Sequence, residues 1–110
     1  MQVRKENMNE FKFYGTVDQK PELSESNKGF KYCSIILNVK RNYKNQDGSY
    51  DSDKFKVVFF KNAAEEAYDL VGKGTKVIVS GRIQDNSMLK ENNEVLYRSE
   101  LIGERIQEID

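Results

Sequence analysis

Four alternate residues near the middle of the chain have the chemistry to bind unpaired nucleic acid. Lys54, Lys56, Val58 and Phe60 share one face of a strand if this segment is extended, because successive side chains of a strand point to opposite sides. Stacking of a phenylalanine ring on a base contributes roughly 1 to 3 kcal/mol of binding free energy, and lysines neutralise the charge of phosphates. The pattern alone is equally compatible with a packed ring beside solvated charges, since isolated surface aromatics are common.

A second aromatic residue flanked by cations lies a short distance upstream. Arg41, Tyr43 and Lys44 end one predicted strand, next to the return of the same hairpin. Two groups of this kind favour stacking combined with phosphate contact over a chance arrangement. Further cations could extend the contact, although each one alone is more often an ordinary solvated charge: Lys12, Lys61, Lys73 and Arg82.

Charge is distributed unevenly although the chain is neutral overall. Lys and Arg number 18, as do Asp and Glu. Residues 28–61 hold eight Lys or Arg against three Asp, a local charge of plus five, whereas residues 94–110 hold five acids against two bases, a local charge of minus three. Nucleic-acid-binding domains are often basic, so the middle of the chain is where we expect such a partner.

Catalysis finds little support in the residue types. Histidine is absent and Cys33 is the single cysteine, so zinc sites and Cys/His nucleophile pairs are not expected, and Cys33 is predicted to lie in the core. Asp47, Asp51 and Asp53 could hold a hard cation in a nuclease. Acidic residues in turns usually only form the turn, so we expect no enzyme, no metal and no cofactor.

Alternating apolar and polar residues predict five strands, at Phe11–Val17, Phe30–Tyr43, Asp53–Lys61, Thr75–Ile83 and Val95–Ile102. The turn-forming segments 45–48 and 91–94 predict hairpins, and residues 18–29 predict a surface loop. Asn62–Gly72 changes to a helical period, with Asn62 as its cap and Gly72 at its end.

This order of elements predicts the fold class. The chain is all-β, a five-stranded antiparallel oligonucleotide-binding (OB) barrel with one short helix between the third and fourth strands. With 110 residues it has room for one core, which we place at 9–110, after a flexible arm at 1–8 that could order against a subunit or a ligand. Apolar runs are far shorter than a membrane span, so a membrane partner is not expected.

The opening MNEFKFYGTVDQKPEL resembles the start of bacterial and phage-type single-stranded DNA-binding proteins. That family begins with Met-Asn, an apolar strand and a glycine, followed by Pro-Glu-Leu, and the matching residues here are Met8, Asn9, Gly15, Pro21, Glu22 and Leu23. The segment NYKNQDGSYDSDKFKVVFFKNAAEEAYDLVGKGTKVIVSGRI is similar to the family's basic hairpin, Val-Val-x-Phe strand, helix, and Lys-Gly and Gly-Arg-Ile segments.

The resemblance implies an OB fold and sequence-independent binding and protection of single-stranded DNA during replication, recombination and repair. The short apolar runs and the lack of a leader pattern favour a cytoplasmic location. The resemblance also implies self-association, a homotetramer first and a dimer second. By position, Phe60 and Tyr43 match stacking aromatics of the family. The expected DNA-binding residues are Arg41, Tyr43, Lys44, Lys54, Lys56, Phe60, Lys61, Lys73, Arg82 and Met88.

Three positions depart from the family pattern. Lys54 stands where Trp or Phe is usual, Met88 where many members carry an aromatic, and Glu10 where a lysine is frequent. Neither lysine nor methionine offers an aromatic face, so we expect binding that is weaker or more salt-dependent than is usual in the family.

The family commonly continues into a flexible linker and an acidic tip that recruits replication proteins. This sequence stops at Ile109-Asp110, and Leu101–Ile109 is better suited to finish a strand, so recruitment through such a tail is not expected. The alternative from another class is an OB domain that serves protein assembly, which would bury Phe60 and Tyr43 in an interface.

Overall fold

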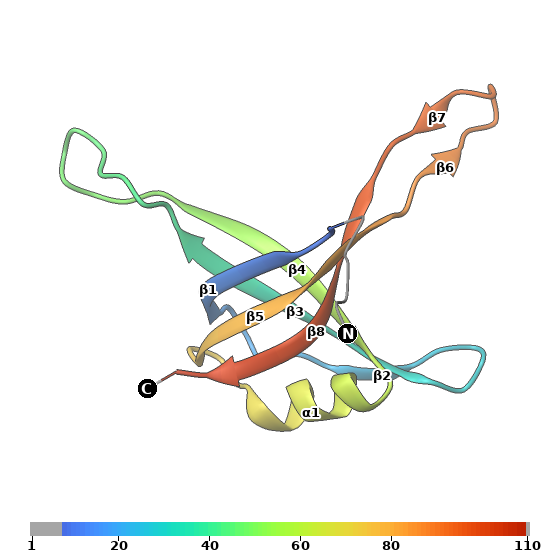
Figure 1. The fold of residues 1–110 in the computed structure, drawn as a ribbon, viewed down its shortest axis with the longest axis horizontal. Helices are drawn as coiled ribbons and strands as arrows, with labels where there is room; N and C mark the ends of the chain where they lie inside the picture. The colour runs from blue at the N-terminus through green and yellow to red at the C-terminus, as the bar shows by residue number, and fades with distance from the viewer. Residues whose placement is uncertain (1–7, 110) are drawn as a thin grey trace, which may run out of the picture.

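The structure, a computed structural model, describes residues 8–109. The predicted arm at residues 1–8 therefore lies outside the described residues except for Met8. The elements in chain order are β1 (Phe11–Val17), β2 (Leu23–Glu25), β3 (Lys31–Lys40), β4 (Ser52–Phe60), α1 (Asn62–Leu70), β5 (Lys76–Asp85), β6 (Met88–Leu89), β7 (Val95–Leu96) and β8 (Ser99–Glu108) (Figure 1).

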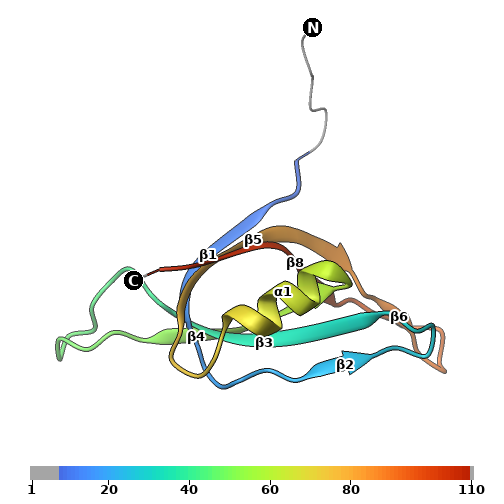
Figure 2. The ribbon, with the colours of Figure 1, turned by 90° about the horizontal axis from the view of Figure 1, so that it is seen from below.

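Five long strands close into a barrel. The sheet order is β1-β5-β8-β4-β3-β2, and a further pairing of β1 with β3 closes the ring. Helix α1 lies between β4 and β5 in the chain and across one end of the barrel in space (Figure 2). This arrangement confirms the predicted OB fold, with the helix between the third and fourth long strands.

Three details of the prediction are corrected. β4 and β8 pair in parallel, with Val57 opposite Leu101, so the barrel is not antiparallel throughout. The segment expected to be a loop contains β2, which pairs with the start of β3. Asn62 does not cap the helix: Lys61 is the N-cap residue, without a side-chain hydrogen bond, and Val71 ends the helix in place of Gly72.

The core lies inside the barrel and beneath α1. Cys33, as predicted, is fully buried, together with side chains such as Ile35, Val57 and Phe59. Burial raises the pKa of the Cys33 thiol, because the thiolate would lose its hydration. Gly15 lies where β1 leaves β5 and meets β3, and a Cβ there would lie 2.8 Å from the carbonyl oxygen of Asn38. The absence of a side chain allows this crossing.

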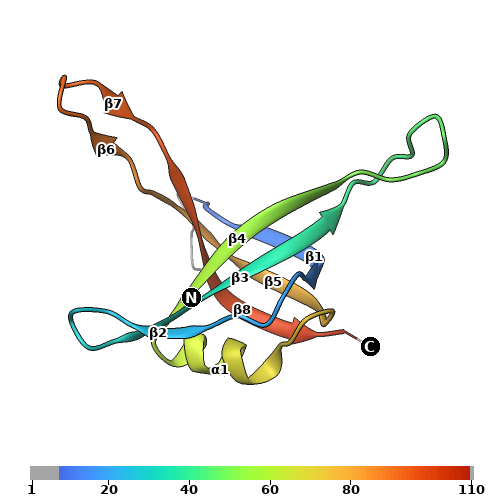
Figure 3. The same ribbon diagram turned by 180° about the vertical axis from the view of Figure 1, so that it is seen from behind.

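Two arms leave the barrel in different directions (Figures 1 and 3). One is the tip of the β3–β4 hairpin, which turns near Asn45 and Gly48 as predicted. The other is the β6–β7 hairpin, in which the Lys90 amide donates to the Glu94 carbonyl at 2.8 Å across the second predicted turn.

Candidate nucleic-acid interface

The outward side of the β3–β4 pair, which we call the outer face, carries the predicted constellation. Lys54 and Lys56 are exposed and Phe60 is half-buried, whereas Val57 and Phe59 face the core. The alternation predicted for this strand is therefore confirmed. Val58, on the same side as the lysines, is only 6% exposed, so it offers little surface of its own.

Three aromatic rings gather at one end of the outer face, which we call the aromatic end: Phe30, Tyr32 and Phe60. Tyr32 lies directly across the ladder from Phe60. The Phe30 and Phe60 rings meet edge to face, with their centroids 6.1 Å apart. This packing fixes the orientation of Phe60 while leaving part of it accessible, as a stacking platform requires.

Sequence reasoning missed Phe30 and Tyr32 as part of this site. The alternation of β3 could have found Tyr32, because it precedes the buried Cys33 and therefore points outward with Ser34 and Ile36. Phe30, the first residue of the predicted strand, lies just before β3, and the pairing of β3 with β4 brings it to Phe60.

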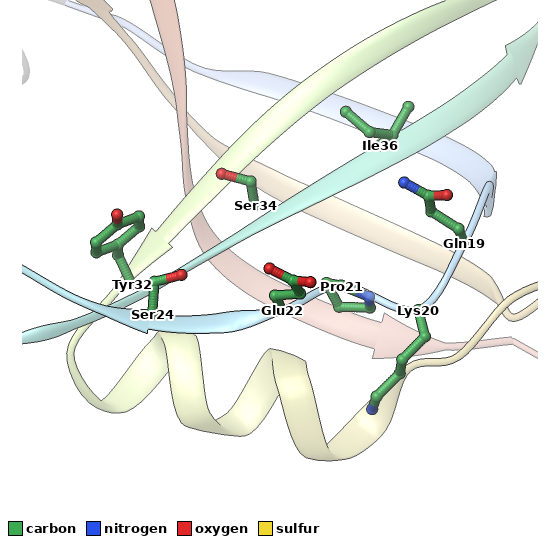
Figure 4. A pocket seen from close by; sticks show the side chains of 8 residues that line it. All are labelled: Gln19, Lys20, Pro21, Glu22, Ser24, Tyr32, Ser34 and Ile36. Carbon is green, nitrogen blue, oxygen red and sulfur yellow. The ribbon is translucent and has the colours of Figure 1, made fainter.

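Shallow grooves run continuously across the aromatic end. One of about 520 Å³ lies between β3 and the segment 19–24, and Tyr32 and Ser34 line both it and a second groove of about 240 Å³ at Phe60 (Figure 4). The second groove shares Lys56 and Glu100 with a third, of about 370 Å³, at the base of the β6–β7 arm. The path is mixed in charge, with carboxylates at Glu22 and Glu100 and cations at Lys20, Lys54, Lys56 and Arg98.

The tip of the β3–β4 hairpin lies beyond the outer face and is built differently, on the side that continues the core-facing rows of β3 and β4. Two Arg41 nitrogens donate to the Asp53 carboxylate, at 2.8 and 3.1 Å, and Asp51 lies 3.6 Å away. Arg41 holds the pKa of Asp53 below its ordinary value, mainly through the side-chain hydrogen bond, and the pKa of Arg41 is raised for the same reason. The guanidinium predicted to contact phosphate is thus already held by carboxylates.

Tyr43 and Lys44 are both exposed at this end, Tyr43 to 60%. The Tyr43 hydroxyl accepts a long hydrogen bond of 3.4 Å from Arg41. Tyr50, which the sequence analysis did not select, adds a ring that is 41% exposed, with the Lys40 and Lys44 nitrogens 5.3 and 6.0 Å from its centroid. The turn residues around Tyr50 gave no periodic pattern that could have indicated this position.

Two lysines of β4 differ in their partners. The Lys54 nitrogen lies 3.5 Å from the Asp18 carboxylate, and its side chain is 65% exposed. Such an exposed pair contributes little stability and exchanges readily for another anion. Lys56 makes no ion pair within residues 8–109.

The remaining predicted residues are dispersed over the molecule. Lys61 follows Phe60 with a φ of 57°, a value that residues other than glycine rarely adopt, and its nitrogen lies 5.9 Å from the Phe30 centroid. Lys73 lies beyond the other end of α1. Arg82 is paired with Glu104 at 3.1 Å, and Met88, 48% exposed, lies opposite Leu96 in the β6–β7 arm.

The aspartates weighed as metal ligands have other partners. Asp51 and Asp53 face Arg41, and Asp47 accepts hydrogen bonds from Ser49, which lowers its pKa. Within residues 8–109, no three His, Cys, Asp or Glu side chains are grouped so as to hold a metal ion. In the same part of the chain, no helix has the length and apolar character needed to cross a membrane.

Comparison with known proteins gives a consistent result. Residues 8–109 match the model of the single-strand binding protein family. The chain is 29% identical over 93 residues to the single-stranded DNA-binding protein 1 of Staphylococcus aureus, which covers 84% of this chain and 60% of that relative's length. It is 28% identical over 102 residues to the single-stranded DNA-binding protein B of Bacillus subtilis, covering 93% of this chain and 90% of the relative.

Proposed function

This chain belongs to the single-strand binding protein family, and on that premise we propose that it binds and protects single-stranded DNA without sequence preference during replication, recombination and repair. The observation that carries the proposal is the aromatic end, where the half-buried Phe60 ring is held by Phe30 beside Tyr32. A ring held in this way can stack on any base, and duplex DNA keeps its bases out of reach.

The proposed mechanism divides the work between rings and cations. Phe60 stacks one base at the aromatic end and Tyr43 stacks another at the hairpin. Lys54, Lys56 and Lys61 neutralise phosphates between and beside them, and Lys44 does so at the tip. Arg41, Lys73, Arg82 and Met88 complete the proposed set from the margins of the surface.

The same proposal includes no catalytic step and no cofactor, and it places the protein in the cytoplasm. We propose that residues 9–110 form the binding domain and residues 1–8 an arm. Self-association into a homotetramer, with a dimer as the second possibility, is a further part of the proposal, since unpaired edges of the sheet can join subunits.

The test is fluorescence anisotropy of labelled poly-dT against a duplex of equal length, at low and moderate salt, with protein of known oligomeric mass. Tight, salt-sensitive binding to poly-dT alone supports the proposal. Absence of binding contradicts it and favours the assembly-module alternative. In that case Lys54 and Met88, the departures from the family pattern, are the first residues to replace with aromatics.

A further inference from the structure

A groove of about 500 Å³ lies where the end of β8 runs beside the C-terminal half of α1 (Figures 1 and 3). We call it the acidic groove and define it by five of its lining residues: Glu66, Asp69, Leu70, Ile106 and Glu108. The first three share one side of α1, because residues three and four apart on a helix are neighbours. The described residues that line the groove belong to α1 and β8, so it is separate from the outer face of β3 and β4.

Two large apolar side chains form the floor of the acidic groove. Leu70 is 36% exposed at the end of a helix that buries Ala64 and Ala67 against the barrel. Ile106 is half-buried and packs against the core. An apolar side chain placed in the groove would remove part of both surfaces from water, which is favourable.

The rim of the acidic groove carries charge of one sign. Glu66, Asp69 and Glu108 are exposed, and none of them makes an ion pair within residues 8–109. Among the described residues that line the groove there is no Lys or Arg. Three carboxylates around an apolar floor attract a cationic ligand and repel phosphates.

The carboxylates of α1 lie where they do not stabilise the helix. Asp69 is in the last turn, where the free carbonyl groups carry a partial negative charge, and Glu66 precedes it by three residues with the same sign. The Lys20 ammonium group offsets this charge from the segment 19–24, since it donates to the carbonyls of Tyr68 and Val71 at 2.5 and 2.8 Å. Lys20 does not line the acidic groove, so the side of α1 that faces β8 lacks such compensation.

We propose that the acidic groove docks a segment of a partner protein in which an apolar side chain lies between lysines or arginines. The apolar side chain packs on Leu70 and Ile106, and the cations face Glu66, Asp69 and Glu108. This inference goes beyond the proposed function and does not depend on it. Because the groove is separate from the outer face, the partner can dock while DNA is bound there.

The test uses two synthetic peptides with blocked ends, Gly-Lys-Leu-Lys-Lys-Leu-Lys-Gly and the same peptide with serine at both leucine positions. Their charges are equal, so only the leucine peptide can use the apolar floor. Methyl NMR at physiological salt, which screens distant charges, should show shifts of the Leu70 and Ile106 signals with the leucine peptide and weaker binding of the serine peptide. Glu66→Gln/Asp69→Asn should weaken binding of the leucine peptide roughly 2- to 30-fold, the range expected for two exposed ion pairs.

Matched variants separate the groove from the rest of the surface. Glu91→Gln/Glu94→Gln changes the net charge equally at the turn of the β6–β7 arm and should keep wild-type affinity for the leucine peptide. Leu70→Ser should abolish the difference between the two peptides, whereas Leu89→Ser, on the same arm and 67% exposed, should preserve it. Circular dichroism, sedimentation and anisotropy with oligo-dT give the fold, mass and DNA affinity of each variant.

The outcomes distinguish the partner segment from other occupants. Weaker binding of the leucine peptide to Glu66→Gln/Asp69→Asn, with mass and oligo-dT affinity unchanged, supports the docking site. No binding, equal binding of both peptides, or unshifted Leu70 and Ile106 signals overturns it. A changed mass overturns it in favour of contact between copies of this chain, and a changed oligo-dT affinity overturns it in favour of DNA. The peptide titrations need no DNA, so failure of the wild-type protein to bind oligo-dT overturns the proposed function alone.

Discussion

The aromatic end and the tip of the β3–β4 hairpin lie at opposite ends of the same strand pair and differ in how their side chains are held. At the aromatic end, Phe60 is half-buried against Phe30, and the carboxylate of Glu100 lines the same groove. At the hairpin tip, Tyr43 and Tyr50 are more exposed, and Arg41 is paired with Asp53 and Asp51. The rings of the first region are held by packing, whereas those of the second are open to solvent.

The difference teaches that affinity and salt dependence are separable on this protein. A ring that packing already orients loses little entropy when a base stacks on it, so the aromatic end should supply energy that salt hardly changes. Phosphate contacts derive their energy from counterion release, so the lysines of β4 and of the hairpin tip should supply most of the salt dependence. Each prediction below tests this division, beginning with the largest effect.

Phe60→Ala should have the largest effect. Loss of stacking should cost roughly 1 to 3 kcal/mol of binding free energy. The slope of log Kobs against log salt concentration, which we call the salt slope, should stay at its wild-type value, because no phosphate contact is removed. Anisotropy with oligo-dT measures both quantities, and circular dichroism checks the fold. Unfolding of the variant would show that Phe60 is a core residue, and a reduced slope would contradict the division.

The sequence predicted the long strands and the OB fold because alternation is a local property. Pairing partners are not local, and so the parallel contact of Val57 with Leu101 and the short strand β2 were missed. Alternation also fails where a hairpin leaves the barrel. Tyr43 has the same parity as the buried Cys33, yet it is exposed, because β3 ends at Lys40 and both sides of the hairpin then meet solvent.

The candidate site was predicted in part for the same reason. Lys54, Lys56 and Phe60 were placed together correctly by the period of one strand. Two further rings were not selected: the register of β3 against β4 brings Phe30 to Phe60, and it brings Tyr50 of the hairpin turn to Lys40. Ion pairs such as that of Arg41 with Asp53 also depend on cross-strand register, which composition does not specify.

Lys54→Trp should sharpen the comparison by giving the middle of the outer face an aromatic side chain. Lys54 is 65% exposed and its pair with Asp18 is weak, so the substitution should not disturb the fold. We expect a gain of about 1 to 2 kcal/mol in binding free energy, within the range for one stacked base. The slope of log Kobs against log salt should become less steep by about 0.7, because one phosphate contact is lost. Titration with oligo-dT at several salt concentrations measures both, and Lys54→Gln is the control that removes the charge without adding a ring.

Tyr43→Ala should have a smaller effect than Phe60→Ala. The Tyr43 ring is 60% exposed and is held by one long hydrogen bond from Arg41, so ordering it on a base offsets part of the stacking energy. We expect a loss of about 1 kcal/mol, near the lower limit for stacking, and Tyr43→Phe should restore most of it. A loss equal to that of Phe60→Ala would show that preorganisation does not distinguish the two ends.

The smallest effect should come from Asp53→Asn, which releases Arg41. Hydrogen bonding to Arg41 lowers the pKa of Asp53, so the pair is fully formed above the ordinary carboxyl pKa and is lost only as pH falls through the lowered value. At neutral pH the guanidinium therefore stays with its carboxylates in the wild-type protein. Asp53→Asn removes one of the two carboxylates beside Arg41, and Asp51 remains 3.6 Å away. The slope of log Kobs against log salt should therefore become steeper by at most about 0.7, the value for one added phosphate contact.

Two measurements on this pair check the reasoning independently. NMR titration of the Asp53 carboxyl should give a midpoint below that of an exposed aspartate in the wild-type protein, and a midpoint closer to the ordinary value in Arg41→Gln. DNA titrations of Asp53→Asn should show the steeper salt dependence. An unchanged slope together with a lowered Asp53 midpoint would mean that Asp51 alone keeps Arg41 from DNA. The hairpin would then contribute through its tyrosines and lysines only, and Asp51→Asn/Asp53→Asn would be needed before Arg41 could neutralise a phosphate.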